Sequence, residues 1–314
     1  MPRNNKKQNT KRNTKRKNKY TLKKMNCSPA VKGKTALRDS CLTSDTLKQL
    51  KEYYNDSHPD TPITQNTPSK IWISLKRRLK TCDREDCWLD LITDNTVRNT
   101  IDNYIFAPDQ PDSWKNKPNT WLDTNDIHKV LLQYQDSHPK FRVIRPTPID
   151  FDAKIGGLLE DNCVTEELCN FNLTNEINSG KTKFGIVFNL DKHNQSGSHW
   201  VALYIDTDAQ ITYYMDSVGD KSPKEIKQFI QRIKEQAASI DIDITHHETH
   251  VPHQRGNTEC GMYCLYFIIT MLTGDNDNVK LNNMNDRISF FKGSRIPDKY
   301  ISEFRNKYFN KMDK

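Results

Sequence analysis

Residues 254–272 read Gln-Arg-Gly-Asn-Thr-Glu-Cys-Gly-Met-Tyr-Cys-Leu-Tyr-Phe-Ile-Ile-Thr-Met-Leu. From Met262 onward the residues are almost all apolar, which predicts a helix buried in a core. Cys260 stands at the start of this helix, where free backbone N–H groups and the helix dipole stabilise a thiolate. Asn257 or Thr258 is expected to cap the helix. The pattern favours a cysteine nucleophile with an oxyanion site beside it, and a merely packed cysteine is the alternative.

A histidine and an acid occur in a second pattern, upstream of the cysteine. His199 ends a polar loop and opens the apolar run 201–205, a predicted buried strand. A second predicted strand, 211–215, ends at Asp216. In such a hairpin the two side chains lie close, and an acid beside an imidazole fixes its tautomer and stabilises the imidazolium. A half-buried histidine and an unrelated turn aspartate are the alternative reading.

These residues together resemble the family of ubiquitin-like-protein-specific proteases and the adenovirus protease, and more closely the thiol proteases of large cytoplasmic DNA viruses. The matching positions, in the family's order and with its glutamine-to-cysteine spacing, are His199, Asp216, Gln254 and Cys260. Trp200 matches the tryptophan that follows the family's histidine, and Trp121-Leu122 resembles its Trp-Leu opening of a helix. The resemblance covers residues 110–314. Glu259 departs from it, since many cellular members have Asp before the cysteine.

The resemblance implies an α+β cysteine protease core, with a central mixed sheet packed between helices and the cysteine at the N-terminus of a buried helix. Cys260 would attack an amide, His199 would transfer the proton, and Asp216 would orient His199. The Cys260 N–H and the Gln254 amide would hold the oxyanion. Trp121 and Trp200 would bind substrate, closing over a slot that admits only glycine before the scissile bond. No cofactor is implied.

The partner implied by the resemblance is a protein substrate. The leading hypothesis is cleavage of viral structural polyproteins after Gly-Gly-type sites during virion maturation, in the host cytoplasm and the virion. One alternative is a protease that removes ubiquitin or a ubiquitin-like modifier from host conjugates. Another is a non-catalytic basic virion protein, against which the four intact positions argue. The sequence predicts no oligomeric state.

Charge is unevenly distributed along the chain. Residues 1–38 hold 14 of the 48 Lys and Arg and no Asp or Glu, so the mildly acidic remainder has 34 basic against 40 acidic residues. Residues 1–24 are predicted to be a disordered basic tail that attracts nucleic acid, an acidic surface or an import receptor, with a merely solubilising tail as the alternative. Neither a signal peptide nor a long apolar run is found, so we expect a soluble protein without a membrane partner.

Cysteines and histidines are the residues that could form disulfides or bind a metal ion. Without a secretory signal the eight cysteines are expected to be reduced thiols in an intracellular protein, and their spacings do not match a zinc knuckle. A histidine-rich segment, with His246, His247, His250 and His253 beside Glu248, offers possible metal ligands. Its glutamate is misplaced for a zincin helix, so we predict no metal and interpret these residues as loop histidines near the site entrance.

The remaining pattern divides the chain at the proline-rich stretch 108–118. Residues 25–110 are predicted to be a helical accessory region, with helices capped at Thr43 and after Thr67-Pro68. Residues 111–314 are predicted to be the protease domain. Its expected elements are a helix after Trp121, strands at 141–144 and 184–190 around an acidic loop 150–180, a helix opened by a capping box at 222–225, a strand at 240–244 and a last helix through Ile301, Phe304 and Tyr308.

Overall fold

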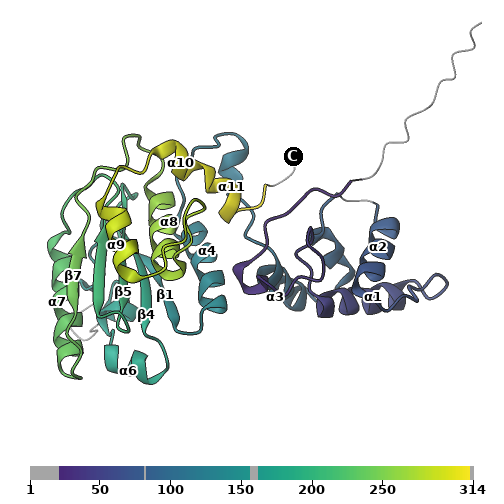
Figure 1. Cartoon of the computed structure of the whole chain (residues 1–314), viewed down its shortest axis with the longest axis horizontal. Coiled ribbons are helices and arrows are strands. Elements are labelled where there is room, and N and C mark those ends of the chain that lie inside the picture. Colours follow the sequence, from purple (N-terminus) through teal and green to yellow (C-terminus); the bar gives the residue numbers. More distant parts are fainter. Residues whose placement is uncertain (1–20, 81–82, 156–161, 312–314) are drawn as a thin grey trace, which may run out of the picture.

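The computed structural model describes residues 21–80, 83–155 and 162–311. The predicted tail, residues 1–24, therefore lies outside the described residues except for its last four. Figure 1 shows a helical part, drawn in purple and blue, beside a larger part that contains the sheet. Within the described ranges, no helix combines the length and apolarity that a bilayer crossing requires.

The helical part is built from α1 (Ser44–Ser57), α2 (Pro68–Arg78) and α3 (Asn95–Ile105), with 3-10 turns at Pro29–Val31 and Asp86–Leu91. Thr43 caps α1, as expected, because its side chain accepts the Thr46 N–H. Pro68 opens α2, also as expected. The apolar faces of these elements meet in one cluster, which includes Leu47, Leu50, Ile71, Leu75 and Trp88. The sequence pattern missed α3, because Ile105 is its only buried residue.

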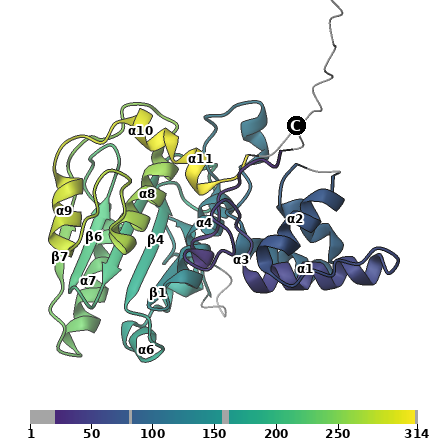
Figure 2. The same ribbon diagram turned by 45° about the vertical axis from the view of Figure 1, so that its right-hand side comes forward.

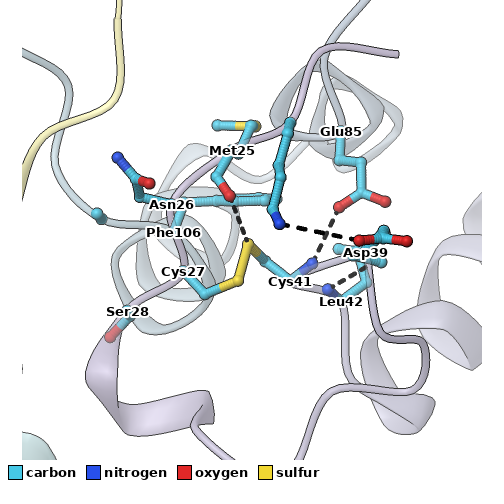
Figure 3. The surroundings of a disulfide bond; sticks show 12 residues. Met25, Asn26, Cys27, Ser28, Asp39, Cys41, Leu42, Glu85 and Phe106 are labelled. Carbon is cyan, nitrogen blue, oxygen red and sulfur yellow. Dashed lines mark hydrogen bonds and ion pairs between the residues drawn. A yellow bond between two sulfur atoms is a disulfide. The ribbon is translucent and has the colours of Figure 1, made fainter. Parts of the chain in front are cut away.

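A disulfide between Cys27 and Cys41 closes a loop of the helical part (Figure 3). Cys163 and Cys169 also pair. The expectation of reduced thiols is therefore wrong for these four cysteines, since the fold brings their Cα atoms to 5.1 Å and 6.3 Å, within bonding range. Among the described cysteines, Cys260 and Cys264 are free.

The sheet of the larger part is mixed, as the resemblance implies. Its strands are β1 (Phe141–Pro148), β4 (Lys183–Asn189), β5 (Trp200–Asp206), β6 (Ile211–Met215) and β7 (Thr245–Glu248), in the spatial order β1-β4-β5-β6-β7. The β1/β4 and β6/β7 pairs are parallel, whereas β4/β5 and β5/β6 are antiparallel. The predicted acidic loop instead holds the ladder β2 (Lys154–Ile155) and β3 (Asn162–Cys163), with helices α5 (Glu166–Cys169) and α6 (Leu173–Asn178).

Helices cover both faces of this sheet (Figures 1 and 2). One face packs on α7 (Lys224–Ala238), through Val201, Leu203 and Ile205 of β5. The other packs on α8 (Cys260–Thr273) and α4 (Thr124–Ser137), through Trp200, Ala202 and Tyr204. A strand covered on both faces has no polar side, which explains its unbroken apolar sequence.

Gly185 in β4 lets α8 lie directly on the sheet. A Cβ atom built at this glycine would stand 2.8 Å from Cγ2 of Ile268 and 2.9 Å from Cζ of Phe141. Both contacts are shorter than van der Waals distance, so any side chain here would push α8 away. This close approach sets the depth at which α8 carries Cys260 into the molecule.

Several local predictions are wrong. Ser222 does not form a capping box on α7, because its hydroxyl donates to Glu248 of β7 and Pro223 takes the cap position. The predicted strand 240–244 is a turn and a loop, and the strand follows at β7. The alternation of Ile and Asp there reflects isoleucines that reach back to the α7 core, among which Ile244 is buried.

The C-terminal segment is also more broken than its pattern predicts. The last helix divides at Phe304 into α10 (Asp298–Glu303) and α11 (Arg305–Tyr308), and α9 (Met284–Lys292) precedes it. Phe309 then packs edge-on against Trp114 in the 3-10 turn Asp112–Lys115. The end of the chain therefore runs back to the stretch before Trp121, which brings both segments next to α8.

Candidate active site

The hairpin of β5 and β6 brings His199 and Asp216 together. His199 directly precedes β5 and Asp216 directly follows β6, and these strands are antiparallel neighbours. Nε2 of His199 lies 2.7 Å from Oδ1 of Asp216. The Val218 N–H donates to the same oxygen at 2.9 Å, which holds the buried carboxylate in place. The second ring nitrogen, Nδ1, is thus left for a partner other than Asp216.

Cys260, the first residue of α8, also interacts with the His199 ring. Burial lowers the pKa of His199, but hydrogen bonds and charge interactions with Asp216 and Cys260 outweigh it and raise the pKa to about 10. An imidazole with so high a pKa is protonated at neutral pH, which suits a thiolate–imidazolium pair. The backbone N–H groups of the first turn of an α-helix have no acceptor within the helix, and they stabilise a negative charge at its N-terminus. In α8 this is the end that carries Cys260.

The start of α8 is set by packing rather than by a side-chain cap. Neither Asn257 nor Thr258 caps it, since Glu259 takes the cap position without a side-chain bond to the helix. Gly261 lets this end approach its neighbours. A Cβ atom there would lie 3.3 Å from Cβ of Leu122 and 3.4 Å from Cδ1 of Trp200. Glycine after the nucleophile therefore serves close packing against the residues that precede α4.

Gln254 is buried and held by Ser217. Its backbone N–H donates to the Ser217 carbonyl at 2.7 Å, and its Oε1 accepts the Ser217 hydroxyl at 2.6 Å. Its Nε2 donates to the carbonyl of Gly256 at 2.8 Å. An amide NH₂ has two N–H donors, and the bond to Gly256 uses one of them. The carbonyl side of this amide is fixed by Ser217, which orients the nitrogen.

Both predicted substrate-binding tryptophans line a cleft of 540 Å³, whereas His199, Asp216, Gln254 and Cys260 do not contribute to its lining. Trp200 is 6% exposed, and its indole N–H donates to the carbonyl of Leu122 at 3.0 Å. Trp121 is 39% exposed, unusual for so large an apolar side chain, and stands just before α4. The loop after β4, including Asp191, Lys192 and His193, also lines this cleft.

The prediction of loop histidines is wrong for His246 and His247, which lie in a strand, and His253 is in a loop but buried rather than at an entrance. His246 and His247 belong to β7, in register with Thr212 and Tyr213 of β6. His253 is fully buried, where Nδ1 accepts the Ile296 N–H and Nε2 bonds to the Phe291 carbonyl, so it braces the fold. No group of His, Cys, Asp and Glu suited to a metal ion is found in the parts of the chain that the structure covers.

Sequence reasoning missed two residues that shape the turn before Cys260. Ser217 directly follows Asp216, but the sequence pattern assigns it no role. Asp298, at the start of α10, accepts the backbone N–H groups of Arg255 and Gly256 at 3.1 Å and 3.2 Å, and the Tyr263 hydroxyl at 3.0 Å. The adjacency of Ser217 to Asp216 was a usable signal. Asp298 offered none, because its partners are more than 30 residues away in the sequence.

Comparison with known proteins places this arrangement in a family context. Residues 186–314 match the model of the Ulp1 protease family, C-terminal catalytic domain. A protein of Acanthamoeba polyphaga mimivirus, named as a thiol protease, is 31% identical over 171 residues, which are 54% of this chain and 54% of the relative. A cysteine protease of African swine fever virus is 33% identical over 129 residues, 40% of this chain and 43% of the relative. The chain thus spans about half the length of the curated relatives it matches.

A solved structure is similar over almost the whole described chain. The crystal structure of the African swine fever virus protease covers 92% of this chain and 97% of its own, with a TM-score of 0.59 and 21% identity. At that identity the likeness concerns the fold, including the helical N-terminal part. Together with the family match and the two viral thiol proteases, it confirms the resemblance drawn from the sequence. Residues 186–314 are therefore similar to the catalytic domain of the Ulp1 protease family.

Proposed function

We propose that this chain is a cysteine endopeptidase that cleaves viral structural polyproteins after Gly-Gly-type sites during virion maturation. The observation that carries the proposal is the geometry of His199. One ring nitrogen is 2.7 Å from Asp216, and the interactions with Asp216 and Cys260 together raise the imidazole pKa to about 10. A merely packed cysteine does not need a protonated imidazole against it.

The reaction follows from the positions of these groups. The Cys260 thiolate attacks the scissile carbonyl, and His199 gives its proton to the leaving amine. Water then attacks the thioester, with His199 as the base, and the carboxyl product leaves. The Cys260 N–H and the second Nε2 proton of Gln254 stabilise the oxyanion of both tetrahedral intermediates. Losing one such donor costs on the order of 3 kcal/mol, about a hundredfold or more in rate.

Glycine specificity is supported by the two tryptophans. Both indoles line the 540 Å³ cleft, and the Trp200 ring is held by the carbonyl of the residue that follows Trp121. An extended substrate that passes between two rings has no room for a side chain. The viral origin of the two curated relatives supports a viral substrate, and with it action in the host cytoplasm and the virion.

A panel of substrates tests the proposal. The purified protein is incubated in parallel with Gly-Gly peptides, capsid-precursor fragments that contain Gly-Gly-X, and ubiquitin-like modifier fusions. Cleavage of the precursor fragments at least tenfold faster than the fusions, measured as kcat/KM, supports polyprotein processing. The reverse ratio favours the modifier protease. No cleavage of any member by wild-type protein, under conditions where Cys260 is reduced, contradicts a protease of either kind and favours the non-catalytic virion protein.

A further inference from the structure

A buried guanidinium stands next to the candidate nucleophile. Arg305 of α11 is 6% exposed, and its Nε and Nη2 donate to the two carboxylate oxygens of Glu259, each at 3.0 Å. Glu259 directly precedes Cys260 in the chain and is 4% exposed. A two-bond pairing of this kind fixes both position and orientation, because the guanidinium fork is planar and rigid.

The same guanidinium also holds two backbone segments. Nη2 donates to the carbonyl of Thr258 at 3.1 Å. Nη1 donates to the carbonyl of Thr120 at 3.0 Å and to that of Pro118 at 3.4 Å. The plane lies over the ring of Trp114, with 4.3 Å from Cζ to the centroid. One side chain thus ties the turn that ends at Cys260 to the segment that ends at Trp121.

From these contacts we infer that Arg305 is a positioning residue, which sets the nucleophile turn and the Trp121 wall of the cleft relative to each other. The inference rests on the proposed function, because it assigns Arg305 a part in that same site. Arg305 touches neither the thiol nor the cleft. It acts through Glu259 and Thr258 on one side and through Thr120 on the other.

Charge gives Arg305 a second effect on the site. The Glu259 carboxylate lies one residue from a group that must become a thiolate, and a nearby negative charge disfavours that form. The paired guanidinium offsets this charge. Without it, a buried carboxylate would remain uncompensated beside the nucleophile, a costly arrangement in a protein interior. Lysine supplies the charge, but it cannot make the forked bonds and reach three carbonyls at once.

Arg287 of α9 offers a matched control, because it binds the C-terminal end of α8, whereas Arg305 acts at the N-terminal end. Its Nη1 donates to the carbonyls of Met271 and Leu272 at the C-terminus of α8, at 2.6 Å and 3.3 Å, and its Nε to that of Leu281 at 3.3 Å. It is likewise an arginine that joins α8 to a neighbouring segment. Loss of Arg287 should therefore cost stability of a similar kind without moving Cys260 or Trp121.

The experiment compares Arg305→Lys and Arg305→Ala with Arg287→Lys and Arg287→Ala in the full chain. The readouts are the melting temperature, the rate at which iodoacetamide alkylates Cys260, kcat and KM on a Gly-Gly peptide, and the ratio of kcat/KM between Gly-Gly and Ala-Ala peptides.

For both Arg305 variants we expect kcat to fall between about tenfold and a hundredfold, the magnitude expected when the nucleophile is slightly misplaced. Alkylation of Arg305→Ala should slow, and its Gly-Gly preference should shrink. Added ethylguanidinium should restore kcat of Arg305→Ala, whereas ethylammonium should not.

The Arg287 variants should lose melting temperature and keep kcat, alkylation rate and glycine preference. If the Arg305 variants show only a lower melting temperature, as expected for Arg287, the inference is overturned. If Arg305→Ala does not fold, Arg305→Lys decides by the same kcat and glycine-preference readouts. Failure of the proposed function is seen separately, as absence of cleavage by wild-type protein. In that case the alkylation rates still decide whether Arg305 orders the turn, with equal rates in wild-type and Arg305→Ala protein counting against it.

Discussion

Nε2 of His199 bonds to Oδ1 of Asp216 at 2.7 Å, and this bond makes both the stability and the activity of the protein depend on pH. The pKa of His199 is raised from 6.5 to about 10, so its charged form persists far into the alkaline range. A group whose pKa rises on folding stabilises the fold fully below its unfolded pKa, and this contribution is lost as pH rises through the folded pKa. The stabilising contribution of His199 is therefore lost between about pH 6.5 and about pH 10.

Asp216→Asn should move the alkaline limb of kcat/KM to lower pH, because it removes an interaction that raises the His199 pKa. It should also lower kcat by about 10²- to 10⁴-fold while leaving residual activity, since the acid orients the imidazole and does not transfer the proton. Rate profiles from pH 5 to 11 measure both effects. Glu248→Gln is the control, because it removes the carboxylate partner of His246, 3.0 Å away in β7, and should leave the limb in place. If the alkaline limb of kcat/KM stays in place in Asp216→Asn, the pairing of His199 with Asp216 is contradicted.

Cys260→Ala and His199→Ala should each abolish peptide cleavage, because no other described thiol or imidazole stands at this position. The melting temperature should change little for Cys260→Ala, since only a sulfur atom is removed. Cys264→Ala is the control, one turn further along α8, where burial raises the thiol pKa well above its ordinary value and keeps it unreactive. Activity that survives in Cys260→Ala and disappears in Cys264→Ala would reverse the assignment.

Wild-type protein should cut a Gly-Gly-X peptide and leave its Ala-Ala-X analogue intact, because a methyl group would clash between the rings of Trp121 and Trp200. Trp121→Ala should lower this ratio at least tenfold with little loss of stability, since the side chain is 39% exposed. Trp200→Ala should also lower the rate by losing substrate alignment, but its buried ring makes unfolding a competing cause. Comparable kcat/KM values for the two peptides in wild-type protein would contradict a slot that admits only glycine.

Gly261→Ala should lower kcat while the protein stays folded. The added methyl group meets Leu122 and Trp200 at 3.3 Å and 3.4 Å, so either α8 or the wall of the cleft must shift. Overpacking of this kind costs roughly 1–3 kcal/mol, which thermal unfolding can measure. Unchanged kcat together with unchanged stability would mean that the start of α8 has more room than these distances allow.

Deletion of Met1–Lys24 should leave peptide hydrolysis nearly unchanged but weaken binding to DNA or RNA, because these residues carry 11 of the 48 Lys and Arg and no Asp or Glu. Affinity measured at two salt concentrations should show a steep salt dependence that nearly disappears in the truncated protein. A full-length variant whose tail has every Lys and Arg replaced by Gln is the matched control and should behave like the deletion. Equal affinity with and without the tail, at both salt concentrations, would contradict this role.

The amino-acid sequence alone determined the local elements that carry the site. An almost entirely apolar stretch after Cys260 predicts a buried helix, and two apolar runs joined by a short turn form the hairpin of His199 and Asp216. These signals are local, because periodicity and turn chemistry depend on residues near one another in the chain. The family resemblance added Gln254 and the two tryptophans. Expectations that relied on a single side chain failed more often, as at Ser222 and Thr258, where a tertiary partner or packing took over the cap.

The tertiary structure alone decided how these elements meet. Asp298 and Arg305 reach back from the end of the chain to the turn before Cys260, and Ser217 fixes the amide of Gln254. The helix α3 and the pairing of Cys27 with Cys41 were likewise invisible in the pattern. For Asp298, Arg305 and Ser217 the physical reason is the same. A buried polar group must find a partner wherever the fold places one, and that partner's distance along the chain leaves no periodic trace in the sequence.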